Sequence, residues 1–418
     1  MNLDYFKMTP VRNLSTDVEL NNVSIRDLVD LIRNENVQHY VNQLYNFDRD
    51  ENVNITNIKR AFKVIKSHVE RFNRKRLLVQ NNNVDVEVLH HQEIQKSLFN
   101  FQISNCIDED TGENIQNASC VAIYNSIGQF YDDRKLKRYL NYLKDNNLHD
   151  ILSSVNHSWK DYYNRAEYVP LNVFRTLYDG EYYFAKSINK QGYKEYGIGE
   201  VFVIAILEHI ALQKQNNSIS FTIDKLSLSE SEIDFQVSSN EAYQTENGAL
   251  LPSMRIYSKD DGETGISISS MIKFRYSVER EEYLYFYTRK DKNLDIHEKV
   301  SFNHTVSENT FVEKFSAIKD IYYNYQNIVT DIDLFSQVGN LQELLARLEQ
   351  KIESNNSPFR EVQSVRDLFK RDSIRHIENL ASLLEYCGQI ETLELDYDIE
   401  SKLRYLISNL LIYNKADY

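Results

Sequence analysis

The spacing of apolar residues changes its period twice along the chain. In the first third, apolar positions recur at helical spacing over residues 24–45, where Ser24 is placed to cap the first turn. Residues 55–79 show the sharpest amphipathic pattern, and residues 120–146 and 151–163 repeat the helical period. The apolar stripe of residues 55–79 contains Phe62, Ile65, Val69 and Phe72. This part of the chain is therefore predicted to be mostly helical.

From about residue 170 the apolar positions alternate instead. Residues 171–188 place apolar and aromatic side chains on both sides of Asp179-Gly180, a pair that accepts positive φ in a tight turn, so a β-hairpin is expected. Residues 200–214 are apolar almost all round and fit a buried helix or a central strand, and their length favours the helix. Five alternating segments between residues 218 and 289 predict an antiparallel sheet.

After about residue 306 the helical period returns. Two runs have the spacing of coiled-coil seams, and a break at Asn355–Pro358 precedes two further helices, 360–387 and 397–413. The first seam contains Phe311, Phe315, Ile318, Tyr322, Tyr325 and Val329, and the second contains Leu334, Val338, Leu341, Leu345, Leu348 and Ile352. These patterns predict a C-terminal helical bundle that joins copies of the chain into a homo-oligomer.

Together the patterns predict an α+β fold in three regions. Residues 1–150 form a helical N-terminal region with a basic helix, residues 151–305 form a β-rich central domain with a buried helix, and residues 306–418 form the C-terminal helical bundle. A chain of 418 residues is long enough for two or three domains. Its 11 Gly and 4 Pro are few, so long regular elements are expected.

Composition also bears on the setting of the protein. Abundant Asn, Ile, Lys and Tyr resemble the product of an AT-rich genome, as in many phages and some bacteria. The longest apolar run, Val201–Leu207, is far shorter than the roughly 18 residues of a spanning helix, and the N-terminus lacks the pattern of a secretory signal. The three cysteines, Cys106, Cys120 and Cys387, are widely spaced and fit a reducing compartment. We expect a cytoplasmic protein with no membrane contact, inside the bacterial host cell if a phage encodes it.

The most localised charge feature is a basic segment in an otherwise acidic chain. The net charge is -14, yet residues 59–76 hold eight Lys and Arg against Glu70 alone, a local balance of +7. The eight are Lys59, Arg60, Lys63, Lys66, Arg71, Arg74, Lys75 and Arg76. Such a helix face could track the phosphate backbone of a nucleic acid. The alternative is a solvated face whose cations pair with acidic residues of the chain or of a second subunit.

Further basic residues follow in the same region. A smaller cluster would extend the basic patch, although it comes directly after two aspartates. Its members are Arg134, Lys135, Lys137 and Arg138.

Other motifs favour structural roles over catalysis. Arg371 and His376 have the spacing of a helical, metal-independent ribonuclease family, but the Asn that usually follows the Arg is missing. His90-His91-x-Glu93 suggests a metal site, yet adjacent histidines point in different directions on a helix or a strand. Gly262 and Gly265 fit a hairpin turn better than a phosphate loop, and nucleotide-binding and common hydrolase motifs are absent. We therefore predict no catalytic residue, no metal and no cofactor.

Several segments between about residues 150 and 325 follow one another in the order of a known family. They are SSVNHSW (Ser153–Trp159), VFRTLYDGEYYFAKSI, KEYGIGEVFVIAILEHI, LLPSMRIYSKDDGETGISISSMIKFR and FNHTVSENTFVEKFSAIKDI. Together they resemble the phage- and plasmid-borne family of domain of unknown function 932. The resemblance marks Arg175, His304 and Thr305 as family positions, implies a phage or mobile-element setting and supplies no established activity. The chain departs from the family at Arg275–Val278, where Cys-x-Asn-Gly is common.

The leading hypothesis is a non-enzymatic phage or mobile-element protein. It would self-associate through its C-terminal helices and contact nucleic acid through the basic N-terminal helix. A second hypothesis is a virion component or counter-defence factor whose acidic surface and aromatic-rich sheet bind a phage or host protein. The least favoured hypothesis is a metal-independent ribonuclease that uses Arg371 and His376.

Overall fold

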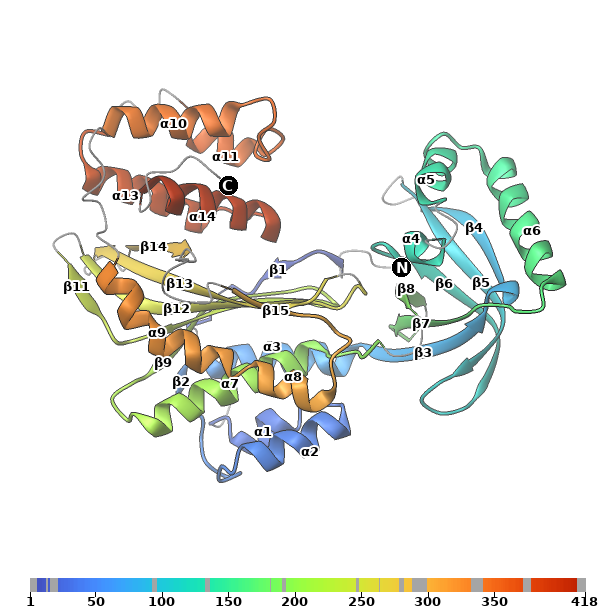
Figure 1. Ribbon diagram of the computed structural model, residues 1–418, viewed down its shortest axis with the longest axis horizontal. Coiled ribbons are helices and arrows are strands. Elements are labelled where there is room, and N and C mark those ends of the chain that lie inside the picture. Colours follow the sequence, from blue (N-terminus) through green and yellow to red (C-terminus); the bar gives the residue numbers. More distant parts are fainter. Residues whose placement is uncertain are drawn as a thin grey trace.

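The computed structural model shows two bodies joined side by side (Figure 1). It describes residues 6–12, 14–15, 22–91, 96–131, 136–180, 182–189, 193–245, 248–262, 264–277, 282–287, 299–331, 341–370 and 377–411. Residues 73–189 make up the barrel body, and the remaining described residues make up the central body, which is built on a large sheet. The predicted α+β class is confirmed.

The central sheet is antiparallel along its main path, β1-β9-β10-β12-β13-β14. Five of these strands fall on the five alternating segments of the sequence, which confirms that prediction. They are β9 (Phe221–Leu228), β10 (Glu232–Ser239), β12 (Gly248–Lys259), β13 (Ile266–Ser277) and β14 (Glu282–Tyr287). Short strands complete the sheet, namely β1 (Thr9–Pro10), β2 (Ile55–Thr56), β11 (Tyr243–Thr245) and β15 (Lys299–Phe302).

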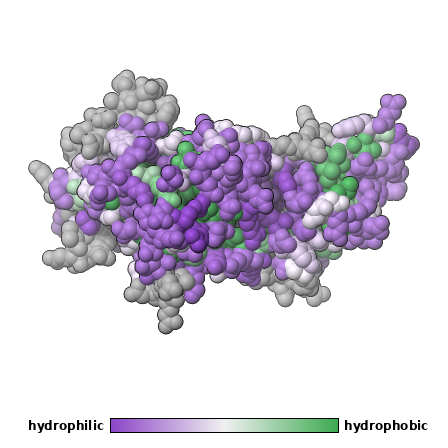
Figure 2. Space-filling model, turned by 90° about the horizontal axis from the view of Figure 1, so that it is seen from below, coloured by the Kyte–Doolittle hydropathy of each residue, from purple (hydrophilic) through white to green (hydrophobic). Residues whose placement is uncertain are grey.

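Helices from distant parts of the sequence cover the lower face of this sheet in Figure 1. They are α1 (Ile25–Val29), α2 (Glu35–Leu44), α3 (Ile58–Arg71), α7 (Ile198–Gln215), α8 (Glu308–Lys314) and α9 (Ala317–Asp331). The predicted cap at Ser24 is confirmed, because its side chain accepts a hydrogen bond from the Asp27 backbone. The apolar sides of these helices and the sheet form one core, and Figure 2 shows that their outer side is mostly hydrophilic.

Helix α7 occupies the centre of that core. Its side chains from Ile198 to Ile210 are all buried, which explains why this segment is apolar on every side. The prediction of a buried helix over residues 200–214 is therefore confirmed. No helix among the described residues is both long and apolar enough to span a membrane.

The C-terminal helices are divided between two places. Helices α8 and α9 join the lower face, whereas the later helices pack around the β14 edge of the sheet. These later helices are α10 (Leu341–Glu353), α11 (Gln363–Leu368), α13 (Leu380–Gly388) and α14 (Tyr397–Leu411), with the 3-10 turn η4 (Gln389–Thr392) between the last two. The prediction of one bundle over residues 306–418 is wrong in this respect, because α8 and α9 bury their apolar faces against α7 and the sheet.

Where the structure describes them, residues of the expected coiled-coil seams are buried within the chain itself, whereas Leu334 and Val338 lie outside the described residues. Phe311, Phe315 and Ile318 are fully buried in the core of the central body, and Leu348 and Ile352 are buried among the C-terminal helices. Self-association stays a prediction, but these residues no longer support it.

Side chains of η4 and α14 cover the β14 edge of the sheet. The backbone N–H of Tyr285 donates to Glu391 at 3.2 Å, and that of Tyr287 donates to Ser408 at 3.0 Å. Because a sheet edge with free N–H groups attracts further strands, these contacts block edge pairing. Phe274, Tyr285 and Phe286 are also fully buried, so these aromatic side chains of the sheet are covered by the chain itself.

The barrel body corrects the prediction that residues 1–150 are helical. Residues 73–122 form four strands, and the hairpin β7–β8 joins the same sheet. The strands are β3 (Asn73–Gln80), β4 (Val84–His91), β5 (Lys96–Asp108), β6 (Asn114–Ala122), β7 (Leu171–Tyr178) and β8 (Tyr183–Asn189). Their order is β3-β7-β8-β6-β5-β4, and pairing of β3 with β5 closes all but β4 into a ring. The predicted hairpin at Asp179-Gly180 is confirmed, with Gly180 at φ 101°.

Three helices between β6 and β7 pack on the barrel. They are α4 (Ser126–Phe130), α5 (Lys137–Asp145) and α6 (His149–Arg165). Leu140, Leu143 and Leu152 enter the barrel core beside Phe101 and Phe174. Because α5 and α6 belong to this core, the body runs across the expected boundary at residue 150 and is an insertion between α3 and α7.

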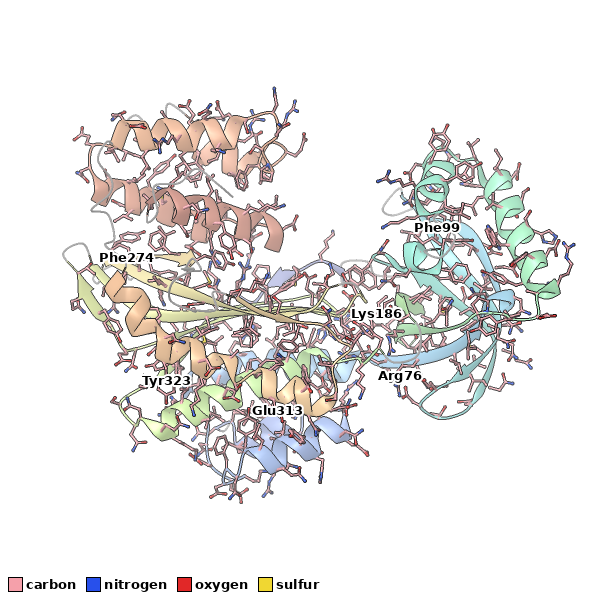
Figure 3. All side chains as sticks on the ribbon, in the orientation of Figure 1. Arg76, Phe99, Lys186, Phe274, Glu313 and Tyr323 are labelled. Atoms are coloured by element: carbon pink, nitrogen blue, oxygen red, sulfur yellow. The ribbon has the colours of Figure 1, made fainter. Side chains whose placement is uncertain are left out.

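A buried ionic cluster fastens the barrel to the central sheet. Lys186 on β8 is fully buried and donates to Asp260, at the end of β12, at 2.5 Å and to Glu195. Burial by itself raises the pKa of Asp260, but the nearby Lys186, His304 and Arg74 lower it overall to well below its usual range. Figure 3 shows Lys186 at the junction of the two bodies.

The turn after β12 adds a backbone contact to the junction. Gly262 adopts φ 81°, and a side chain there would collide with Ser187 and Asn189 of β8. Gln129 of α4 donates to the Asp261 carbonyl at 2.9 Å. The prediction that these glycines serve a turn between strands is confirmed, and the turn is also the docking point of the barrel.

We predict that Lys186→Met destabilises the protein by about 3–5 kcal/mol, because Asp260 and Glu195 would remain buried without their shared cation. Urea unfolding followed by fluorescence measures the change. Lys66→Met, at a side chain that is 52% exposed, is the matched control and should change stability by less than about 0.5 kcal/mol. A loss below about 1 kcal/mol in Lys186→Met would contradict a fastening role.

Candidate functional site

The eight predicted basic residues lie on two different elements. Five are on α3, but the helix ends at Arg71, and Arg74, Lys75 and Arg76 belong to strand β3. The prediction of one continuous basic helix over residues 59–76 is therefore wrong at its C-terminal end. The chain leaves the helix because residues 73–80 pair with β7 along their whole length and bury Leu77 and Val79 in the barrel.

The three basic residues of β3 are engaged by acidic side chains. Lys75 donates to the buried carboxylate of Asp108 at 2.5 Å, and Arg76 pairs with Asp110. Arg74 places its Nε 3.8 Å from a Glu195 carboxylate oxygen. For these three residues the structure favours the alternative hypothesis, in which the basic residues pair with acidic residues of the chain.

The lysines on the outward face of α3 differ from the basic residues of β3 in their contacts with acidic side chains. Lys59, Lys63 and Lys66 are spaced by four and three residues, so they form one stripe along the helix. Lys59 and Lys63 form no ion pair with any residue that the structure describes, and Lys66 lies 3.9 Å from the half-exposed carboxylate of Glu70. Helix α3 as a whole carries five Lys and Arg against one acid, so the basic surface persists in shortened form.

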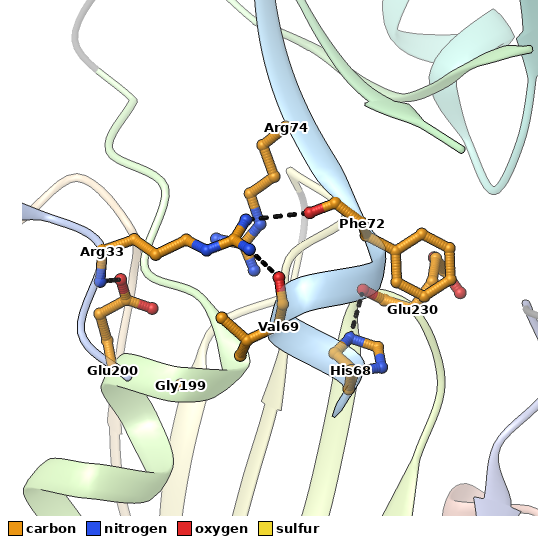
Figure 4. Close-up of a pocket in the computed structure, with 8 residues that line it drawn as sticks. All are labelled: Arg33, His68, Val69, Phe72, Arg74, Gly199, Glu200 and Glu230. Atoms are coloured by element: carbon orange, nitrogen blue, oxygen red, sulfur yellow. Dashed lines mark hydrogen bonds between the residues drawn. The ribbon is translucent and has the colours of Figure 1, made fainter. Parts of the chain in front are cut away.

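Contacts at the end of α3 fix its position (Figure 4). The Arg33 guanidinium donates to the carbonyls of Val69 and Phe72, the latter at 2.9 Å, and thereby caps the C-terminus of the helix. The Arg33 backbone N–H in turn donates to Glu200 of α7 at 3.0 Å. The enclosed space among these residues, about 10 Å³, is at the lower limit for one water molecule.

An open groove runs beside this end of the helix. This α3 groove has a volume of about 360 Å³. It lies between α3, strand β1 and the turn after β9. Its lining is Lys7, Thr9, Pro10, Val11, Val64, Ser67, His68, Arg71, Phe72, Leu228, Ser229 and Glu230. Cations and apolar side chains therefore share one concave surface.

Two titratable groups line the floor of the α3 groove. Burial lowers the pKa of His68 to about 4, helped by the nearby Arg74, so this histidine is neutral at pH 7. Burial raises the pKa of Glu230 to about 7, although a hydrogen bond from Tyr124 favours the charged carboxylate. The groove therefore carries little negative charge below pH 7.

The family positions named from the sequence meet at the junction of the two bodies. Arg175 and His304 lie against the same residue, Tyr193, with the guanidinium 4.8 Å and the imidazole 5.2 Å from its ring centre. Both side chains are 1% exposed, and Ser307, not His304, caps α8. Thr305 is exposed, so it does not join this cluster.

Sequence reasoning did not find Lys186 or Asp260, the residues that complete the cluster. Their signal is weak, since Lys186 is a single charged residue in the middle of a strand and Asp260 directly follows another strand. Arg175, Lys186 and His304 line none of the grooves described for this structure, and their burial keeps substrates away. The cluster therefore joins the two bodies.

The topology of the barrel raises a second candidate for a nucleic-acid surface. Its strand order is that of the five-stranded barrel known as the OB-fold, which binds oligonucleotides across its second and third strands, here β5 and β6. Outward residues such as Gln102, Ser104 and Ser119 are uncharged. The hairpin that joins these strands carries Asp108, Glu109, Asp110 and Glu113. Lys75 and Arg76 pair with Asp108 and Asp110, and the four acids still leave this hairpin with a net negative charge, so charge favours α3 over the barrel.

Several other residues named from the sequence are untested by the structure or lie away from α3. Arg371, His376, Arg134, Lys135 and Glu93 lie outside the described residues. Lys137 and Arg138 are exposed on α5, in the barrel body and away from α3 (Figure 1). The cysteines are buried and free, and no group of metal-ligating side chains occurs within the described ranges.

We predict that Glu230 makes stability depend on pH. Its ordinary pKa of 4.5 in the unfolded chain and its folded pKa of about 7 mean that the folded state keeps a proton that the unfolded state releases. This contribution is complete below about pH 4.5 and is lost as pH rises through 7, a change of about 3 kcal/mol. In urea unfolding, the free energy of unfolding of Glu230→Gln relative to that of the wild type should therefore increase by that amount between pH 4.5 and pH 8.

Glu70→Gln is the control for this prediction, because the Glu70 side chain is 64% exposed. Its unfolding free energy should follow that of the wild type at every pH. If the unfolding free energies of Glu230→Gln and wild type change with pH in parallel, Glu230 ionises normally in the folded protein and the prediction is wrong.

Comparison with protein-family models, with curated proteins and with solved structures finds no match to this chain, so the functional argument rests on its own residues.

Proposed function

We propose that this protein is a non-enzymatic nucleic-acid-binding protein of a phage or mobile element, and that it contacts the phosphate backbone through α3. The observation that supports the proposal is the stripe of Lys59, Lys63 and Lys66 on the outward face of that helix, with Glu70 as its one acidic neighbour on α3. The apolar side of α3 is buried in the core, so the helix presents this stripe from a fixed position.

The dimensions and charge of the stripe fit a phosphate backbone. At a rise of 1.5 Å per residue, the seven steps from Lys59 to Lys66 extend over about 10 Å, enough to meet several phosphates. Helix α3 keeps this positive surface in a chain with a net charge of -14. Binding through so few cations should be weak at physiological salt and strong at low salt, because it gains from counterion release.

The test is a double charge reversal, Lys63→Glu with Lys66→Glu. Removing two phosphate contacts should weaken binding to labelled oligonucleotides by at least about tenfold at low salt and reduce the slope of log K against log salt by about 2. Fluorescence anisotropy with single-stranded and duplex probes across a salt series measures both quantities.

The matched control places the same charge change on the barrel body. Lys137→Glu with Arg138→Glu, at two exposed positions of α5, should leave the affinity and the salt slope nearly unchanged. If the wild type binds neither probe at low salt, or if both double variants lose affinity equally, the proposal for α3 is wrong.

A further inference from the structure

The α3 groove borders the lysine stripe along one side of the helix. Successive helical residues are turned by about 100°, which places Ser67 and Arg71 on the flank next to Lys63 and directs them toward β1. A nucleic-acid strand that follows the stripe therefore reaches the groove within one turn of the helix.

The lining of the α3 groove combines two kinds of contact. Lys7, two residues before β1, and Arg71, the last residue of α3, supply cations to the lining. Pro10, Val11, Val64 and Leu228 supply apolar surface. A nucleotide needs both kinds, because its phosphate is anionic while its base and sugar have apolar faces.

The charge of its lining residues distinguishes the α3 groove from two larger grooves. A groove of about 830 Å³ between β1, the central sheet and α14 is lined by seven acids and four Lys or Arg. A groove of about 510 Å³ beside α8 is balanced, with two lysines and two acids. In the α3 groove, two Lys or Arg face one acid, Glu230.

We infer that the α3 groove receives a single-stranded segment of nucleic acid, with its phosphates at Lys7 and Arg71 and its base or sugar on the apolar lining. The inference rests on the proposed function and names its substrate class. A volume of about 360 Å³ falls in the range of small-ligand sites and suits one or two nucleotides. A duplex keeps its bases stacked inside the helix, so it can bind the outer stripe but cannot enter the groove.

A steric variant tests this without changing charge. Ser67 is exposed at the rim of the groove, and Ser67→Leu narrows it, whereas Ser67→Ala leaves it open. The wild type should bind a single strand about tenfold more tightly than a duplex of the same length, as expected when base contacts add to phosphate contacts. Ser67→Leu should remove this preference while its duplex affinity stays within about twofold, and Ser67→Ala should behave as wild type.

A second measurement needs no variant. Acetylation of Lys7, followed by mass spectrometry, should slow in the presence of the single-stranded probe and continue at its free rate with the duplex. The double reversal at Lys63 and Lys66 should weaken both probes, because both contact the stripe.

The possible failures point to different conclusions. Equal affinity for the two probes, an unchanged preference in Ser67→Leu, or equal protection of Lys7 by both probes would overturn the groove while leaving binding by α3 intact. Absence of binding to either probe at low salt would overturn the proposed function and the inference together.

Discussion

Moving a lysine ammonium from water into a protein interior costs several kcal/mol unless anions surround it. Lys186 meets that condition because Asp260 comes from the central sheet and Glu195 from the segment that leads into α7. The cation itself sits on β8 of the barrel, so its two partners can be reached only when the barrel and the sheet are docked in one way. The arrangement of the two bodies depends on this contact.

The same docking determines how much of the basic segment remains on the surface. The chain leaves α3 and enters β3 at the junction, where Arg74 lies near Glu195. Lys75 and Arg76 then meet the acidic hairpin of the barrel. Before the junction, Lys63 and Lys66 stay exposed on α3, and Lys59 is half-buried. The division of the basic segment into a structural half and a surface half thus follows from where the helix ends.

Local patterns were informative wherever one element decides the outcome. The five strands from residue 218 to 289, the hairpin at Asp179-Gly180 and the buried helix α7 all follow from alternation, turn chemistry or continuous apolar sequence. The pattern misled at residues 73–122, where strands curve into a small barrel. It also misled at the seams around Phe311 and Leu348, because an apolar stripe specifies burial but not the surface that covers it.

By itself the sequence determined the α+β class, the central strands and helix α7, the stripe of Lys59, Lys63 and Lys66, and the absence of common catalytic motifs. Only the tertiary structure decided that α3 stops at Arg71, that Arg175 and His304 share Tyr193, and that a groove borders the helix. The physical reason is range: helix and strand periods arise from neighbours in sequence, whereas the junction and the groove bring together separate segments, as with Lys186 and Asp260, which are 74 residues apart.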